Sequence, residues 1–227
     1  MKSRLGFNKL NNNKGTTLIE MIVSFTLLAI FVSASVVIIS NVTNLYYHVR
    51  GENYARQVGD IVANKISAEI SGAQYSLNSS EANLQIYTES ELKAKYPDFT
   101  DSFSDNSNSV TMYDRTNTKV TIYASDGILN IFYHGFTDEK NTDNSREQLK
   151  WTFDKNMYNG YELEAMEFAY ANTPQNEQLA SKYGISGIDS SAYNGNVIAV
   201  YMKLKSGKYG EFTVCRYVKL YNYPDTY

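Results

Sequence analysis

The residues with the most distinctive chemistry in this sequence lie near its N-terminus, in the segment Lys14-Gly15-Thr16-Thr17-Leu18-Ile19-Glu20. Gly15 presents no side chain to a protease pocket, so we predict that the Gly15–Thr16 peptide bond is a cleavage site. Glu20 is then the fifth residue of the cleaved chain, directly before an uncharged run from Met21 to Ile39. Because a carboxylate at the head of an apolar helix is costly without a partner, we expect Glu20 to pair with a cationic group. A simple membrane anchor has no use for this carboxylate.

No catalytic constellation is predicted elsewhere in the chain. The two histidines, His48 and His134, have no second His or Cys at metal-ligand spacing, and we interpret each as a satisfied or solvated side chain. The single cysteine, Cys215, lies in an alternating segment that predicts a buried strand residue rather than a nucleophile. We therefore predict that the protein is not an enzyme and has no cofactor.

Calcium is the one ion that the sequence leaves open as an alternative. Ca²⁺ prefers oxygen ligands, and two polar loops contain several of them. Neither loop has the spacing of a known calcium-binding motif, so no metal site is predicted. The residues concerned are Asp98, Asp101 and Asp105 in the first loop, and Asp138, Glu139, Asp143 and Asn144 in the second.

The segment that positions Glu20 is predicted to be a membrane-spanning helix, because the uncharged run is about as long as a helix that crosses a bilayer. The leader before it carries four basic residues and no acidic one, and positive charge keeps such a flank cytoplasmic. We therefore expect the chain to be inserted in the cytoplasmic membrane with its C-terminal part outside. The alternative is an ordinary secretory signal peptide cut near Ser33-Ala34-Ser35.

The helical pattern continues beyond the apolar run, from Asn41 to about Gln74. Apolar residues recur there at spacings of three and four, which is typical of an amphipathic helix that packs on a core. Gly51 and Gly59 are expected to weaken this helix and Gly72 to end it. The predicted apolar stripe consists of Leu45, Val49, Val58, Ile61, Val62, Ile66 and Ile70, with Tyr54 between them.

Short alternating segments separated by turn residues follow, and they predict a β-rich head. Ser125-Asp126-Gly127 and Ser206-Gly207-Lys208-Tyr209-Gly210 are expected to form hairpin turns. One short helix is predicted from Gln175 to Lys182. The predicted strands are residues 84–88, 110–113, 119–124, 128–133, 149–153, 161–170, 197–205 and 212–221.

Together these elements predict an α+β fold, in which a long N-terminal helix packs on a mostly antiparallel β-sheet head. The chain is long enough for one anchor and one domain of ordinary size. The predicted divisions are a basic leader at 1–15, a membrane or fibre-core helix at 16–40, an amphipathic helical stem at 41–75 and a globular head at 76–227.

Charge argues against a general nucleic-acid binder, because the net charge is −3. A small basic patch is nevertheless predicted at Lys203, Lys205 and Lys208, on one strand and its turn. Such a patch could contact a phosphate backbone. We interpret it first as a soluble edge strand, and no specific nucleic-acid partner is predicted.

The N-terminal features resemble the type III signal of type IV prepilins and type II secretion pseudopilins, in which a prepilin peptidase cuts after a glycine. The glycine, the short basic leader, the fifth-position Glu and the charge-free run all match. The resemblance implies cleavage after Gly15, N-methylation of Thr16 and pairing of Glu20 with the terminal amine of a neighbouring subunit. Two features depart from the family: Thr16 stands where Phe is usual, and no proline precedes Pro97.

This resemblance implies a structural subunit of a type IV pilus-like or type II secretion-like fibre. The length of the head and the stem resemble minor pseudopilins of the J type. The implied partners are other pilin subunits, a prepilin peptidase and the membrane, and the implied final location is the cell surface, in a pilus or fimbrium. Two alternatives remain open, a competence pseudopilin for DNA uptake and a surface-anchored binding protein that does not polymerise.

Replacement of the glycine tests the predicted cleavage. Gly15→Val should leave the leader attached, because a branched side chain does not fit a pocket shaped for glycine, whereas Gly15→Ala should be cut at least in part. Mass spectrometry of the N-terminus of the membrane-extracted protein measures the outcome, and the wild type is expected to begin at Thr16, methylated or not. An N-terminus at Val36 would show an ordinary signal peptide and contradict the pilin interpretation.

Overall fold

The computed structural model describes residues 17–74, 84–135 and 147–223 of the chain. Their helices are α1 (Leu18–Ser71), α2 (Glu89–Lys95) and α3 (Pro174–Lys182), with short 3₁₀ turns η2 (Lys155–Tyr158) and η3 (Ser190–Ala192). Their strands are β1 (Leu84–Tyr87), β2 (Ser109–Tyr113), β3 (Lys119–Ser125), β4 (Ile128–Tyr133), β5 (Leu149–Thr152), β6 (Glu162–Tyr170), β7 (Val197–Ser206) and β8 (Gly210–Lys219).

The predicted α+β fold is confirmed, with a long N-terminal helix and antiparallel sheets. Each of the eight strands overlaps a predicted segment, and α3 overlaps the predicted short helix. Helix α2 was not predicted. It begins with a capping box, in which the Thr88 hydroxyl accepts from the Glu91 backbone and the Glu91 carboxylate accepts from the Thr88 backbone.

Two compact units divide the chain between Tyr47 and His48. The described residues of the first unit after Thr17 are helical and belong to the N-terminal part of α1. This helix contains a window of 18 residues that is apolar enough to cross a membrane, and none of that window is buried. By length and composition, the first unit therefore has the properties expected of a membrane segment.

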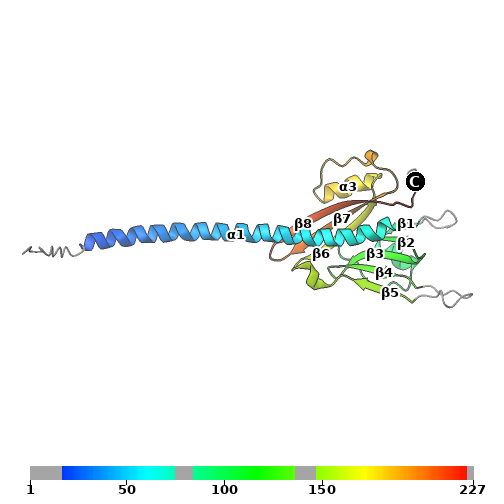
Figure 1. The fold of residues 1–227 in the computed structure, drawn as a ribbon, viewed down its shortest axis with the longest axis horizontal. Helices are drawn as coiled ribbons and strands as arrows, with labels where there is room; N and C mark the ends of the chain where they lie inside the picture. Colours follow the sequence, from blue (N-terminus) through cyan, green and yellow to red (C-terminus); the bar gives the residue numbers. More distant parts are fainter. Residues whose placement is uncertain (1–16, 75–83, 136–146, 224–227) are drawn as a thin grey trace, which may run out of the picture. The chain divides into compact units, whose positions relative to one another are not determined.

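The second unit contains two antiparallel sheets, one with the strand order β1-β2-β3-β4-β5 and one with the order β6-β7-β8. The last part of α1, in cyan in Figure 1, crosses both sheets. Side chains from this part of α1 and from the inner faces of both sheets form one continuous core. Alternate residues of most strands enter this core, as the period of two along a strand requires, whereas β5 contributes only the partly buried Trp151.

The outer face of each sheet is covered by a short helix. Leu179, Ala180 and Tyr183, from α3 and its C-terminal end, pack with Ala199 and Tyr201 on the outer face of the three-stranded sheet. Leu92 of α2 packs with Phe99 and Tyr123 on the outer face of the five-stranded sheet. Each sheet is thus buried on one side by α1 and partly covered on the other.

The predicted apolar stripe of α1 was only partly correct. Val58, Val62, Ile66 and Ile70 are buried as predicted, but Leu45, Val49 and Ile61 are 62%, 48% and 44% exposed. Leu45 belongs to the other compact unit, and Val49 and Ile61 lie outside the buried face of the helix. Small residues complete that face instead, namely Gly51, Ala55, Gly59 and Ala63.

The glycines in this face let the β7–β8 hairpin approach the helix closely. A Cβ atom on Gly59 would lie 2.6 Å from Cγ2 of Val214, and one on Gly51 would lie 2.6 Å from Cβ of Tyr209. Such distances are shorter than van der Waals contact, so no larger residue fits without a shift. The sequence suggested that Gly51 and Gly59 weaken the helix; in the structure they also admit the hairpin.

Polar contacts fix the same interface at its edges. The Arg216 guanidinium lies 3.0 Å from the Asp60 carboxylate, and the Tyr161 hydroxyl donates to the Gly51 carbonyl at 3.0 Å. Near the end of α1, the Asn222 side-chain amide donates to the Ala73 carbonyl at 3.0 Å. These three contacts lie near the start, the middle and the end of the buried part of the stem.

A double-mutant cycle tests the close approach at Gly59. In a fragment starting at Asn44, Gly59→Ala should lower the free energy of unfolding by about 1 kcal/mol, since overpacking costs about 1–3 kcal/mol and the better helix former returns about 1 kcal/mol. In a Val214→Ala background the clashing methyl is gone, and Gly59→Ala should be neutral or stabilising. Denaturant unfolding measures all four proteins.

The control for helix propensity is Ala68→Gly, because Ala68 is exposed on the same helix. It should cost about 1 kcal/mol irrespective of the residue at 214. Additive effects of Gly59→Ala and Val214→Ala, to within about 0.5 kcal/mol, would show that the two residues do not compete for space.

Candidate functional site

The N-terminal end of α1 is capped by its own side chains. The Thr17 backbone amide donates to the Glu20 carboxylate at 2.8 Å, and the Glu20 amide donates to the Thr17 hydroxyl at 3.3 Å. Thr17 therefore occupies the N-cap position of a capping box, with Glu20 at the third helical position. Gly15 and Thr16, the predicted processing residues, lie outside the described residues.

This capping box gives Glu20 a local partner that the sequence analysis did not identify. A carboxylate in the first turn also interacts favourably with the helix dipole. The presence of Glu20 is therefore useful even to a simple anchor helix, and by itself it does not indicate assembly. The signal was present in the sequence, as a Thr followed three residues later by a Glu directly before an apolar run.

The few polar side chains of the apolar run are satisfied within the helix. The hydroxyls of Thr26, Ser33 and Ser35 each donate at 2.8 Å to the backbone carbonyl four residues earlier. A hydroxyl that is bonded to its own helix needs no water, which lowers the cost of placing it in hydrocarbon. These residues therefore do not oppose a membrane location for the helix.

Comparison with known proteins gives one match. The model of the prokaryotic N-terminal methylation motif matches residues 10–36, which include Gly15, Thr16 and Glu20. This is the N-terminal motif of type IV pilin-like proteins. Searches of characterised proteins and of solved structures found no match. The matched segment overlaps the start of α1, the helix that is long and apolar enough to cross a membrane.

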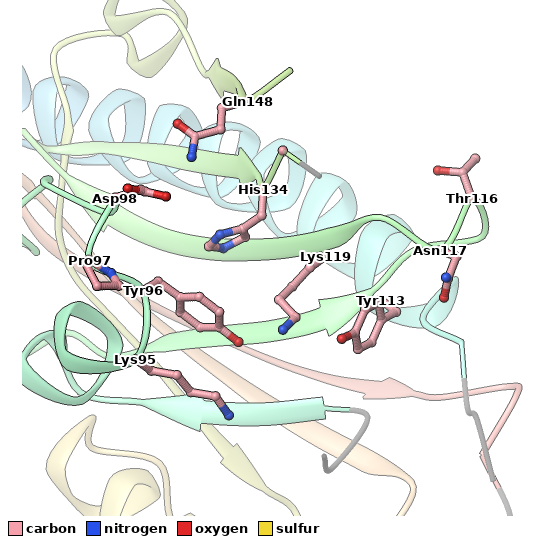
Figure 2. A pocket seen from close by; sticks show the side chains of 11 residues that line it. Lys95, Tyr96, Pro97, Asp98, Tyr113, Thr116, Asn117, Lys119, His134 and Gln148 are labelled. Carbon is pink, nitrogen blue, oxygen red and sulfur yellow. The ribbon is translucent and has the colours of Figure 1, made fainter. Parts of the chain in front are cut away.

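The head contains a pocket of about 500 Å³ on the outer face of the five-stranded sheet (Figure 2). Residues after the end of α2, at one side, face residues from β2, β3 and the end of β4. Lys95, Tyr96, Tyr113, Lys119 and His134 are among its lining residues. The sequence analysis did not predict this pocket, because its residues come from separate elements.

Lys119 lies between two tyrosines in the pocket. Its ammonium nitrogen is 4.9 Å from the centre of the Tyr96 ring and 5.2 Å from that of Tyr113. Partial burial lowers the pKa of Lys119, but hydrogen bonds to the two tyrosine hydroxyls outweigh this and the net pKa is raised. Lys119 is therefore cationic at neutral pH.

His134 is held beside this lysine in its neutral form. Its Nε2 atom is 2.8 Å from the Thr121 hydroxyl, and its ring packs on Tyr96 and Phe132 at centroid distances of 4.7 and 4.8 Å. Burial, and secondly the charge of Lys119, lower the pKa of His134 to about 4, although the Asp98 carboxylate acts in the opposite direction. The interpretation of His134 as a satisfied histidine is consistent with these contacts.

The basic patch predicted at Lys203, Lys205 and Lys208 is largely neutralised. Lys203 lies 2.9 Å from the Glu164 carboxylate and 2.8 Å from that of Glu211, and Lys205 lies 2.6 Å from Glu164. Lys208 lies over the Tyr209 ring. Ion pairing of this kind leaves little positive potential for a phosphate backbone.

In the first of the two acidic loops, the carboxylate of Asp101 is bonded to other residues of the protein. Asp101 accepts hydrogen bonds from Lys150 and from the Tyr123 hydroxyl. Among the described residues, no group of three or more His, Cys, Asp or Glu side chains is placed to hold a metal ion. Asp138, Glu139, Asp143 and Asn144 of the second loop lie outside the described residues.

Cys215 is partly buried on the outer face of the three-stranded sheet, where it packs against the cluster that contains Tyr201. Burial raises the pKa of its thiol, although hydrogen bonds to Tyr201 and Tyr217 act in the opposite direction. A raised pKa reduces the fraction of thiolate, which is the nucleophilic form. The structural interpretation of Cys215 is therefore favoured over a nucleophilic one.

The lowered pKa of His134 predicts a loss of stability in acid. The unfolded chain binds a proton at His134 near pH 6.5, but the folded head binds it only near pH 4. The contribution of His134 to the free energy of unfolding should therefore be fully present above pH 6.5, and it should fall as the pH drops from 6.5 towards 4. Allowing for partial exposure, the loss from this residue should be about 1–2 kcal/mol.

His134→Gln isolates this contribution, because a neutral amide does not titrate. The fragment from Asn44 and its His134→Gln variant should show the same carboxylate-dependent change, and the wild type an additional loss between pH 6.5 and 4. Denaturant unfolding at each pH measures the difference. If the free energy of unfolding depended on pH in the same way for both proteins, the neutral, buried state of His134 would be contradicted.

Proposed function

We propose that this protein is a non-enzymatic minor pilin or pseudopilin, a structural subunit of a type IV pilus-like or type II secretion-like fibre, released from its leader by cleavage after Gly15. The observation that carries the proposal is the methylation motif at residues 10–36, which coincides with an apolar helix that has no buried residue in its most hydrophobic window. A helix with its apolar surface fully available can be inserted first in a membrane and then among other helices.

The proposed partners are a prepilin peptidase and other pilin subunits, and the proposed location is the cytoplasmic membrane, with the head outside, and then the cell surface. The minor, J-type-like assignment is supported by the head itself. Its two sheets and two short covering helices make it a substantial domain rather than a small shaft module.

Two other functions can be compared with this proposal. A competence pseudopilin that draws in DNA would need accessible positive charge, and the ion pairs of Lys203 and Lys205 with Glu164 and Glu211 do not favour it. A surface-anchored binding protein that never polymerises agrees with the capping role of Glu20. A fibre subunit differs from this alternative in one respect: the charge of Glu20 should be needed for assembly as well as for capping the helix.

Substitutions at Glu20 separate these two roles. Gln retains the capping-box hydrogen bond without the charge, whereas Val removes both. In a fibre, the terminal amine of a neighbouring subunit would lose its anionic partner in either variant, at a cost of several kcal/mol. We therefore expect Glu20→Gln and Glu20→Val to be cleaved and inserted normally, but both to be depleted about tenfold or more in sheared fibres.

The matched control is Thr17→Ala, which removes the capping hydroxyl but retains the charge. It should weaken only the first turn of α1, by about 1 kcal/mol, and should enter fibres normally. Immunoblots of sheared and cell-bound fractions measure all three variants. Reduced rather than abolished incorporation of Glu20→Gln would indicate a tip position, because a protomer at the tip has no subunit above it. Wild-type incorporation of Glu20→Gln would favour the anchored binding protein.

A further inference from the structure

The exposed apolar surface of α1 continues beyond the strongly apolar run. Val42 and Leu45 are large apolar residues, and both are exposed. Residues 41–47 were predicted to belong to the stem that packs on the head, yet they lie in the first compact unit and none of them is buried. This part of the helix therefore needs an apolar surrounding of its own.

The length of the uncharged part of the helix matches a whole bilayer rather than its hydrocarbon core alone. No Asp, Glu, Lys or Arg occurs between Glu20 and Arg50. At 1.5 Å per residue, the helix from Glu20 to Tyr47 is about 40 Å long, whereas a hydrocarbon core is about 30 Å thick and a bilayer with its headgroup layers about 40–45 Å. If Glu20 lies in the cytoplasmic headgroup layer, Tyr47 reaches the outer one.

Two adjacent tyrosines lie at this level of the helix. Tyr46 and Tyr47 are 57% and 42% exposed, and their rings pack edge to face with centroids 5.9 Å apart. Tyrosine is enriched where a helix crosses a headgroup layer, because its ring is apolar and its hydroxyl needs a polar partner. Consecutive residues of a helix project about 100° apart, so the pair covers more than one side of it.

The residues beside the tyrosines form an apolar side and a polar side of the helix. Val42, Leu45 and Tyr46 lie on one side, because they are three and four positions apart, and Asn44 and Tyr47 lie on the other. An amide is costly in hydrocarbon but not among headgroups. A helix longer than the hydrocarbon core is thick tilts, so one side leaves the hydrocarbon later than the other. The apolar side suits that position.

We propose that the outer headgroup layer of the membrane surrounds α1 at Tyr46 and Tyr47, and that residues 40–47 contact lipid instead of belonging to the stem. The helix is tilted, with Val42 and Leu45 on the side that stays longest in the hydrocarbon. This inference rests on the membrane insertion in the proposed function. It adds the position of the outer boundary and the residues that hold the helix there.

A second helix fits this surface less well than lipid does. Helices that pack together in a bilayer approach each other through small residues. The apolar side of residues 40–47 carries large side chains instead, namely Val42, Leu45 and Tyr46. Lipid chains adapt to such a surface without a complementary partner. Another copy of the chain is therefore the competing occupant in the test.

Depth-dependent fluorescence quenching of the full chain in phospholipid vesicles tests the proposal. The wild type has one Trp, Trp151 in the head, and its fluorescence is the baseline. Tyr46→Trp and Tyr47→Trp each place a second indole at the proposed boundary, with the same preference for headgroups as tyrosine. In vesicles of brominated lipids, the added fluorescence should fall at least twofold when the bromine is near the headgroup. It should fall less when the bromine is near the end of the acyl chain.

Two further variants calibrate the depth. Phe31→Trp lies in the middle of the apolar run and should be quenched most by bromine near the chain end. Tyr221→Trp replaces a tyrosine that is 76% exposed in the head, and neither lipid should quench it. Phe31→Trp also separates this inference from the proposed function. If bromine does not quench it, the helix is not inserted and both are overturned.

The proposal is upheld if Tyr46→Trp and Tyr47→Trp are quenched most from the headgroup level while Phe31→Trp is quenched most from the chain ends. With Phe31→Trp quenched as expected, it is overturned if the two boundary variants are not quenched, or are quenched most from the chain ends. Quenching that increases at least twofold when the protein is diluted in lipid would assign the surface to another copy, and would also overturn it. Either boundary variant decides the outcome alone if the other fails to insert.

Discussion

The head depends on the burial of one narrow face of α1 by two sheets at once. That face consists of small residues, including Gly51, Ala55 and Gly59, alternating with Val and Ile. Because these side chains are small, the helix backbone lies close to the β7–β8 hairpin, and the larger side chains of the hairpin fill the space beside it. The inner faces of both sheets meet the same helix, so neither sheet completes a core alone. The stem is therefore an internal part of the head rather than a support attached to it.

The strands were predictable because alternation of apolar and polar residues is a direct consequence of strand geometry. The rotation of α1 was predicted less well. Hydrophobic periodicity identifies large apolar residues, and it therefore assigned Val49 and Ile61 to the core although both are more than two-fifths exposed. Glycine and alanine contribute little to hydrophobic periodicity because their side chains are small, yet Gly59 and Ala63 are buried. Whether a small residue faces solvent or a close neighbour depends on an element more than a hundred residues away.

The two capping boxes could be predicted from the sequence, whereas the head pocket could not. Thr17 with Glu20, and Thr88 with Glu91, are local pairs that the sequence displays at a fixed spacing, so both helix starts could have been identified. The pocket could not. Tyr96 follows α2, whereas Tyr113 and Lys119 belong to β2 and β3, and only the strand order places them together. Local chemistry can be predicted from sequence spacing, but a site assembled across a sheet requires the topology.

The contacts between α1 and the C-terminal strands also determine the order of events during synthesis. Asp60 and Arg216 are separated by 156 positions in the chain, and Ala73 and Asn222 by 149. The ribosome makes the stem first and the β7–β8 hairpin that packs on it more than a hundred residues later, so the core cannot close until that hairpin has been made. Contacts of such long range also make folding slow. While the chain between the stem and the hairpin is being made, the small-residue face of the stem has no sheet to pack on, and the first sheet has no helix-covered partner, so both surfaces stay exposed over that interval.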